Sequence, residues 1–110
     1  MMKVFSKLLF ALCAICSTTV AAGADPKAAM ARVEQVCQSC HGMDGNAPIA
    51  DNPKLGGQHA DYLAKALRDY QSGLRKNPIM AGFVDKLSNQ DIENLAAYYA
   101  SQPAVVVTNH

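Results

Sequence analysis

Apolar residues recur every three or four positions in three stretches of the chain, and this spacing places them on one face of an α-helix. The pattern predicts helices over about 27–38, 60–72 and 88–102. No segment shows the strict alternation of apolar and polar residues that is typical of a half-buried strand. The sequence therefore predicts an all-α domain with three main helices.

Several residues mark where these helices begin and end. Asp25 followed by a proline is typical of an N-cap and a first helical turn. Ser88 with Asp91 three residues later resembles a capping box. Gly73 is a candidate left-handed C-cap for the second helix. The first helix is expected to continue to about 41–42.

Two segments are expected to be loops. Residues 42–59 contain four glycines and two prolines, which makes regular structure improbable there. Residues 74–87 contain Asn77-Pro78, which is a turn signal. A loop as long as 42–59 in a small domain is normally functional or wraps around something.

The first 24 residues have the pattern of a secretory signal peptide. Lys3 and Lys7 precede a short apolar run over 8–15, and small residues follow over 20–24. The run is shorter than the ~20 apolar residues of a membrane span. We expect cleavage after Ala22 or Ala24, with an uncleaved N-terminal anchor as the alternative. The domain itself would then be residues 25–110.

Without those 24 residues the chain retains eight basic and nine acidic residues, a formal charge of −1. No cluster of Lys or Arg stands out, so nothing indicates nucleic acid or an anionic membrane surface as a partner. The remaining 86 residues have four tyrosines, Phe83 and no tryptophan. A core this small usually needs a disulfide, a metal or a cofactor to be stable.

The candidate chemistry is in the run Cys37-Gln38-Ser39-Cys40-His41. Two cysteines separated by two residues at the end of a helix present both sulfurs in one direction, toward the two vinyl groups of a haem. The histidine that follows can offer an imidazole nitrogen to the iron. This pattern is a haem attachment signal. Two further cysteines lie within the signal peptide and leave with it.

Two other kinds of site could use the same residues. A structural zinc site needs four ligands, and only His59 or His110 could join Cys37, Cys40 and His41. A thiol–disulfide oxidoreductase could use the cysteine pair, but that motif normally follows a strand, and here an alanine-rich helix precedes it. A structural disulfide across this short spacing would stabilise little.

Beyond the attachment run, the chain resembles the class I c-type cytochromes, in particular the short bacterial periplasmic monohaem type. The resemblance extends over about 27–102. It includes the proline–leucine–glycine loop at 53–58, a Met-bearing segment after it, and the closing helix from Ser88. It implies the cytochrome c fold, with long loops around one haem, and a location in the periplasm.

The resemblance also implies roles for single residues. Cys37 and Cys40 would bind one haem c covalently, and His41 would be an axial iron ligand. Pro53 would offer its backbone carbonyl to the other imidazole nitrogen of His41, which orients the ring. Met80 would be the second axial ligand.

The position of the methionines along the chain favours the same choice. Met30 lies on the helix that carries the attachment run, and Met43 follows His41 by two residues. Only Met80 is far enough downstream to reach the opposite face of a haem. The alternative is an ordinary core or loop methionine.

Other residues are weaker candidates. Arg75 or Lys76 could pair with a haem propionate, although a solvated surface cation is the more frequent case. Gln58 and Tyr62 could line the haem, and burial in a helix face explains them equally well. His59 is expected to be a surface or capping residue rather than a ligand.

The sequence thus predicts a monomeric electron carrier with His/Met ligation, and not an enzyme. Its expected partners are redox proteins that dock transiently at the haem edge, with no nucleic acid and no stable membrane insertion. The competing hypotheses are an exported thiol–disulfide oxidoreductase using Cys37 and Cys40, and a ligand-binding haem sensor with an open axial site.

Overall fold

A computed structural model describes residues 23–104 of the chain. Residues 1–22, which hold nearly all of the predicted signal peptide, lie outside the described residues, as do residues 105–110. Within 23–104 all regular structure is helical, so the predicted all-α class is confirmed. No helix in this range is long and apolar enough to cross a membrane.

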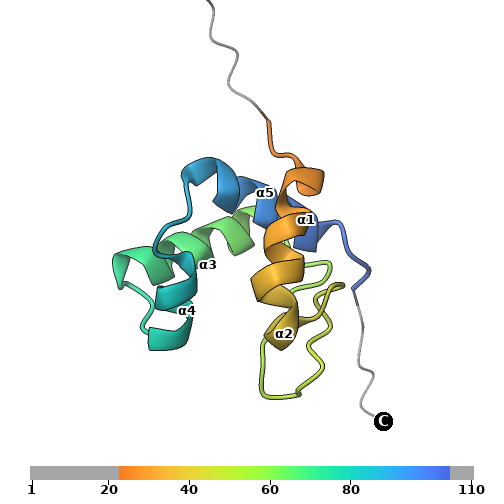
Figure 1. The fold of residues 1–110 in the computed structure, drawn as a ribbon, viewed down its shortest axis with the longest axis horizontal. Helices are drawn as coiled ribbons and strands as arrows, with labels where there is room; N and C mark the ends of the chain where they lie inside the picture. Colours follow the sequence, from red (N-terminus) through yellow and green to blue (C-terminus); the bar gives the residue numbers. More distant parts are fainter. Residues whose placement is uncertain (1–22, 105–110) are drawn as a thin grey trace, which may run out of the picture.

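Six helical segments follow one another along the chain (Figure 1). In order they are α1 (Pro26–Arg32), the π-helical segment η1 (Val33–Cys37), α2 (Gln38–His41), α3 (Ala60–Ser72), α4 (Pro78–Val84) and α5 (Asn89–Ala100). The first three join end to end, so the first predicted helix is a single rod that ends at His41, as expected.

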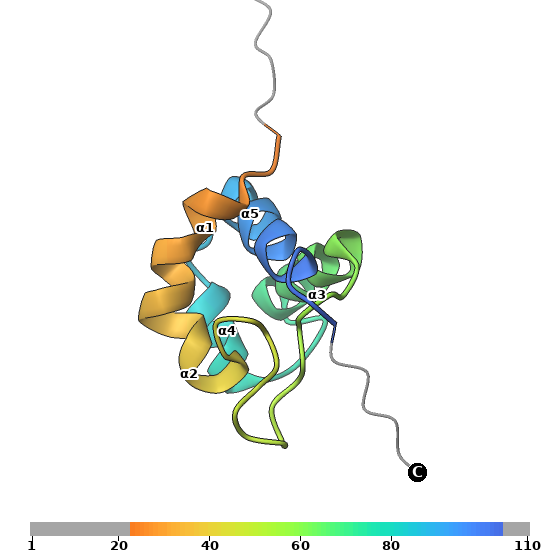
Figure 2. The same ribbon diagram turned by 90° about the vertical axis from the view of Figure 1, so that its right-hand side faces the viewer.

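The core forms where α5 packs against both α1 and α3 (Figures 1 and 2). Val33 from η1 and Ile92 from α5 are fully buried there. Leu63 and Ala64 of α3 complete this contact, and Tyr99 of α5 lies in the same cluster. The amphipathic pattern of the sequence therefore corresponds to real burial, because each helix turns its apolar face toward α5.

Short-range hydrogen bonds fix the helix ends as predicted. The Asp25 carboxylate accepts from the backbone N–H of Lys27 at 3.0 Å, and Ser88 and Asp91 form a reciprocal capping box at the start of α5. Gly73 adopts φ +80° as the C-cap of α3. The N-terminal caps satisfy N–H groups that have no partner within the helix.

The prediction of an unbroken loop over 74–87 is wrong, because α4 lies within it. Asn77 caps this helix, and its side-chain oxygen accepts from the backbone N–H groups of Ile79 at 3.0 Å and Met80 at 3.1 Å. Pro78 occupies the first turn, where a missing N–H costs nothing. The same Asn-Pro pair is typical both of a turn and of a helix start, and local sequence did not distinguish them.

Candidate functional site

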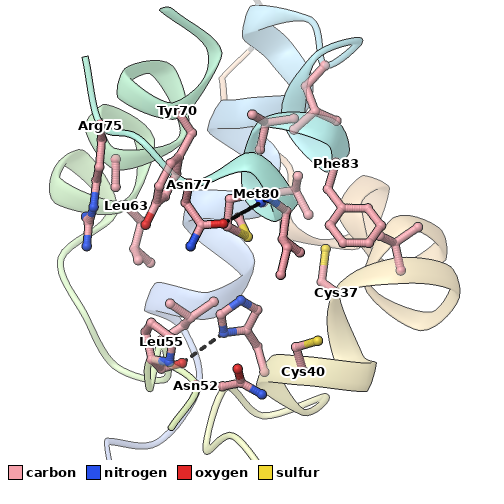
Figure 3. Close-up of a pocket in the computed structure, with 18 of the residues that line it drawn as sticks. Cys37, Cys40, Asn52, Leu55, Leu63, Tyr70, Arg75, Asn77, Met80 and Phe83 are labelled. Atoms are coloured by element: carbon pink, nitrogen blue, oxygen red, sulfur yellow. Dashed lines mark hydrogen bonds between the residues drawn. The ribbon is translucent and has the colours of Figure 1, made fainter. Parts of the chain in front are cut away.

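The rod formed by α1, η1 and α2 carries the attachment run and is called the attachment rod below. A cavity of about 320 Å³ opens between this rod, α3, α4 and the loop 42–59 (Figure 3). Cys37, Cys40, His41, Pro53 and Met80 all line it, although they come from three separate parts of the chain. Most of the remaining wall is apolar. The structure therefore brings every residue of the sequence-predicted site to the wall of one cavity.

The π-helical turn directs the first cysteine into this cavity. The backbone N–H of Gln38 bonds to the carbonyl of Val33, five residues back, in place of the usual four. In a regular α-helix Cys37 would lie on the same face as the buried Val33. The wider turn carries Cys37 round toward the cavity, where Cys40 joins it one turn later (Figure 3). Such π turns occur frequently at functional sites, and nothing in the residue pattern predicted this one.

His41 is buried, with 8% of its surface exposed, and its orientation is fixed by one hydrogen bond. Its Nδ1 lies 2.8 Å from the backbone carbonyl oxygen of Pro53. A carbonyl can only accept, so Nδ1 must carry the proton and donate it. The lone pair of Nε2 is then free on the other side of the ring, which is the form of imidazole that binds a metal.

Close backbone packing brings Pro53 within reach of His41. The carbonyl of Gly45 accepts from the N–H groups of Leu55 at 2.7 Å and Gly56 at 3.1 Å, which folds the loop back on itself. A side chain on Gly45 would place Cβ 2.4 Å from the Gly56 nitrogen, closer than any real contact, and Gly45 also has φ +76°. Glycine at position 45 is therefore required by the geometry of the loop.

Two tyrosines of α5 hold the chain just after His41. The hydroxyl of Tyr98 donates to the carbonyl of Met43 at 2.8 Å, and that of Tyr99 donates to the carbonyl of Gly42 at 3.1 Å. Burial raises the pKa of both hydroxyls, so they remain protonated donors. The loop that supplies Pro53 is thus anchored at its beginning to the core helix.

Met80 lies on the wall formed by α4, and its side chain points into the cavity together with those of Cys37 and Cys40 (Figure 3). It is a helical residue, where the sequence predicted a loop residue. Met30 is 43% exposed and Met43 packs against the core, and neither lines the cavity. Among residues 23–104, Met80 is therefore the only methionine at the site.

Gln71 of α3 supports α4 in a way that the sequence did not suggest. Its side-chain amide donates to the carbonyls of Val84 at 2.7 Å and Leu87 at 2.8 Å, at and just beyond the end of α4. Together with the Asn77 cap, this contact holds both ends of the helix that carries Met80. A glutamine on a helix surface gives no local signal of such a long-range role.

The weaker candidates separate into two groups. Gln58, Tyr62 and Arg75 line the cavity, whereas Lys76 and His59 do not. His59 is exposed and occupies the N-cap position of α3 without a side-chain capping bond. It is therefore a surface residue at a helix start.

The alternatives to haem fit this arrangement poorly. Burial raises the pKa of the Cys37 thiol and the nearby Arg32 charge offsets only part of this, whereas thiol oxidoreductases need a lowered cysteine pKa. Zinc would need several close ligands, and no group of three or more His, Cys, Asp or Glu side chains in the described range could hold a metal ion. Two thiols, a free imidazole nitrogen, a thioether and apolar walls instead match the donor set for haem c.

Comparison with known proteins gives the family. The chain matches the family described as "Cytochrome C oxidase, cbb3-type, subunit III" over residues 24–98. The chain belongs to the c-type cytochromes. Membership in this family implies haem c as the cofactor and confirms the resemblance to the class I c-type cytochromes.

Individual relatives agree with this assignment. The chain is 43% identical over 115 residues to cytochrome c4 of Stutzerimonas stutzeri, a match that spans 96% of this chain but only 53% of that protein. It is 41% identical over 69 residues to cytochrome c-554(548) of Halomonas halodenitrificans, which covers 60% of this chain and 83% of that protein. The chain thus spans about half the length of the cytochrome c4 relative.

A solved structure confirms the fold. Cytochrome c4 of Acidithiobacillus ferrooxidans superposes on the chain with a TM-score of 0.67 at 26% identity. The superposition covers 76% of this chain and 52% of that one. The predicted cytochrome c fold is therefore correct.

Proposed function

We propose that this chain is an electron carrier with one covalently attached haem c, and that it makes and breaks no bond in a substrate. Cys37 and Cys40 form the two thioether bonds in this proposal, and His41 and Met80 are the axial iron ligands. Pro53 orients His41. One haem is proposed because the sequence contains one Cys-x-x-Cys-His run outside the signal peptide.

The observation that carries this proposal is the hydrogen bond from His41 Nδ1 to the Pro53 carbonyl, at 2.8 Å. It leaves Nε2 unprotonated, with a lone pair available to a metal, and His41 lines the cavity together with Cys37 and Cys40. A hydrogen bond of this kind also raises the basicity of the imidazole as a ligand.

The chain's own residues account for attachment and ligation. Cys37 and Cys40 would each hold the haem through a thioether bond formed by addition of S–H across one vinyl group, which consumes no oxidant. Met80 supplies a thioether, which favours the reduced state relative to a second imidazole. When bound, the haem supplies a one-electron ferric–ferrous couple. If both His41 and Met80 bind the iron, they would leave no coordination position for a substrate.

Partners would be redox proteins that dock transiently. Ile79 and Phe83 line the cavity and are 67% and 50% exposed, so apolar side chains reach the surface at its rim. Weak redox encounters use small interfaces, below about 1,200 Å². An exposed apolar rim of a few residues suits a short-lived contact of that size, made by a monomer.

We also propose that the mature domain is residues 25–110 and that it functions in the periplasm after removal of the signal peptide. Asp25 supports this boundary, because its backbone N–H donates to the Asn94 side chain at 2.8 Å while its carboxylate caps α1. Cleavage after Ala24 would convert this N–H into an α-ammonium group, which can still donate to Asn94, and would keep the carboxylate cap. The mass of the protein purified from the periplasm identifies the cleaved bond, and an intact residue 1 would contradict export by cleavage.

The main test is an absorption spectrum of the purified protein, taken before and after acid–acetone extraction and followed by a redox titration. We expect an intense haem spectrum that survives extraction and one reversible one-electron step. A colourless protein, or haem removed by the solvent, would overturn the proposal. Replacement of Cys37 and Cys40 by serine should abolish the haem signal that survives extraction.

Met80 ligation needs a separate test because a haem sensor would share the other features. The reduced protein should bind CO slowly or not at all, and Met80→Ala should bind it rapidly. Met30→Ala, which changes an exposed methionine away from the cavity, is the matched control. Rapid CO binding by the unmodified protein would instead favour a sensor with an open axial site.

A further inference from the structure

The charged residues of the cavity wall are all of one sign. Arg32, Lys54 and Arg75 line the cavity, and no aspartate or glutamate does. This contrasts with the described chain as a whole, in which acidic residues slightly outnumber basic ones. A wall that carries only cations suits a bound group with negative charges.

Arg32 and Arg75 occupy different parts of the wall. Arg32 lies at the end of α1, on the same rod as Cys37 and five residues before it. Arg75 lies on the opposite side of the cavity from Cys37 and Cys40 (Figure 3). In haem the carboxylate-bearing edge of the ring is opposite the vinyl-bearing edge. A haem attached through the two cysteines would therefore direct its carboxylates away from the cysteines and toward the side of the cavity on which Arg75 lies.

Arg75 is also held in place before any ligand binds. Its backbone N–H donates to the carbonyl of Asp69 at 3.0 Å, and its guanidinium carbon lies 5.0 Å from the centre of the Tyr70 ring. Stacking on an aromatic face leaves the N–H groups at the edge of the guanidinium free to donate. Asp69 itself pairs with Lys65, and no carboxylate within residues 23–104 pairs with Arg75.

Neighbouring cations lack these properties. Lys76 does not line the cavity, and no described residue fixes the ammonium group of Lys54. We propose that Arg75 is the residue that pairs with a carboxylate of the bound haem, and that this pair raises the reduction potential. The inference rests on the proposed function, since it requires a haem attached through Cys37 and Cys40.

The direction of the effect follows from charge. Ferric haem carries one positive charge more than ferrous haem, so a bare carboxylate nearby favours the ferric state. A guanidinium paired with that carboxylate offsets its charge and removes the preference. Loss of Arg75 should therefore lower the midpoint potential, and a contact pair should resist salt better than a distant charge does.

The experiment compares the midpoint potentials of holoprotein variants in dilute buffer and in about 1 M salt, where charges are screened beyond about 3 Å. Arg75→Gln should lower the potential under both conditions. Lys76→Gln is the matched control, because it removes the same charge from the adjacent residue, and its effect should vanish in high salt. Arg75→Lys should restore at least part of the potential lost in Arg75→Gln.

The proposal is overturned if the Arg75→Gln shift vanishes in high salt together with that of Lys76→Gln. It is also overturned if Arg75→Lys shifts the potential as far as Arg75→Gln, since the charge would then be irrelevant. The absorption band of the Met80–iron bond must persist in each variant compared, and Arg75→Leu serves as a second neutral variant if Arg75→Gln fails to fold. Failure of the proposed function is distinct, because the unmodified protein would then show no covalent haem at all.

Discussion

Replacing Gln71 by alanine should weaken the binding of Met80 to the iron without altering the attachment site. The Gln71 amide donates to the carbonyls of Val84 and Leu87, and no other side chain in the described range spans from α3 to these two groups. α4 has only seven residues, which is too short for a helix to be stable alone. Its position therefore depends on such tertiary contacts.

The magnitude follows from the two hydrogen bonds. Each contributes roughly 0.5–1.5 kcal/mol net, and Gln71 is on an exposed face where water can replace part of the loss, so we expect about 1–2 kcal/mol in total. If this loss falls on the docking of α4, the population in which α4 has detached rises about 5- to 30-fold. Met80 detaches with it, while Cys37, Cys40 and His41 stay attached.

The assay is a urea titration of the ferric holoprotein, with loss of the Met80–iron absorption band compared with loss of helix by circular dichroism. In Gln71→Ala the band should disappear at clearly lower urea than the helix signal. Gln90→Ala is the control, because in the mature domain Gln90 donates a side-chain hydrogen bond to Asn94 at 2.8 Å, within α5, and no hydrogen bond joins it to α4 among the described residues. Gln90→Ala should lower the urea midpoints of the Met80–iron band and of the helix signal by the same amount.

Gln71→Glu keeps the shape of the side chain but replaces its donating amide with a carboxyl group, so its effect on stability should depend on pH. A carboxylate facing two carbonyl oxygens cannot donate, so the pKa of Glu at this position should rise above the unfolded value of about 4.3. For a raised pKa, the stabilising contribution is complete below the unfolded value and is lost as pH rises through the folded one. The variant should therefore match the parent more closely at acidic pH than at pH 7. If neither Gln71 variant moves the band transition, or Gln90→Ala moves it equally, the reasoning is wrong.

Three further predictions concern stability. Cys37→Ser/Cys40→Ser should not hold a native fold, because the cavity of about 320 Å³ would be left without haem; a cooperative unfolding transition of this variant would contradict that. Gly45→Ala should lower the free energy of unfolding by at least about 2 kcal/mol, because residue 45 has a positive φ and a Cβ there would clash with backbone. Gly82→Ala is the comparison, because a Cβ at this helical position meets open space, and it should raise the free energy of unfolding by about 0.5–1 kcal/mol. Thermal unfolding of both holoproteins measures the two effects. Hydrogen bonds from the N-cap serine of α5 hold the pKa of Asp91 below its usual range, so its contribution is present above the unfolded pKa near 3.9 and lost as pH falls through the folded value. The melting temperature of Asp91→Ala should therefore be lower than that of the parent at pH 7, and the two values should converge toward pH 3.

The attachment run and most helix boundaries could be predicted because they depend on residues that are close together in the sequence. Two cysteines and a histidine at this spacing lie together at one helix end, however that helix packs in the fold. The caps at Asp25, Gly73 and Ser88 act within three residues, and all three were predicted correctly. Chain order likewise favoured Met80 among the methionines, since reaching the far face of a haem needs a length of chain.

Tertiary structure decided everything that depends on contacts between distant segments. The Asn77-Pro78 pair becomes a helix start only because α4 can pack against α3, and Gln71 contributes to that packing across the intervening turn. The π turn lets Val33 pack in the core while Cys37 lines the cavity, and no local residue pattern indicates such a turn. Arg75 and Lys76 are adjacent and carry the same charge, yet only Arg75 faces the cavity, because stacking on Tyr70 directs it there. The sequence determines which groups are available for haem chemistry, and packing between distant segments determines which of them meet.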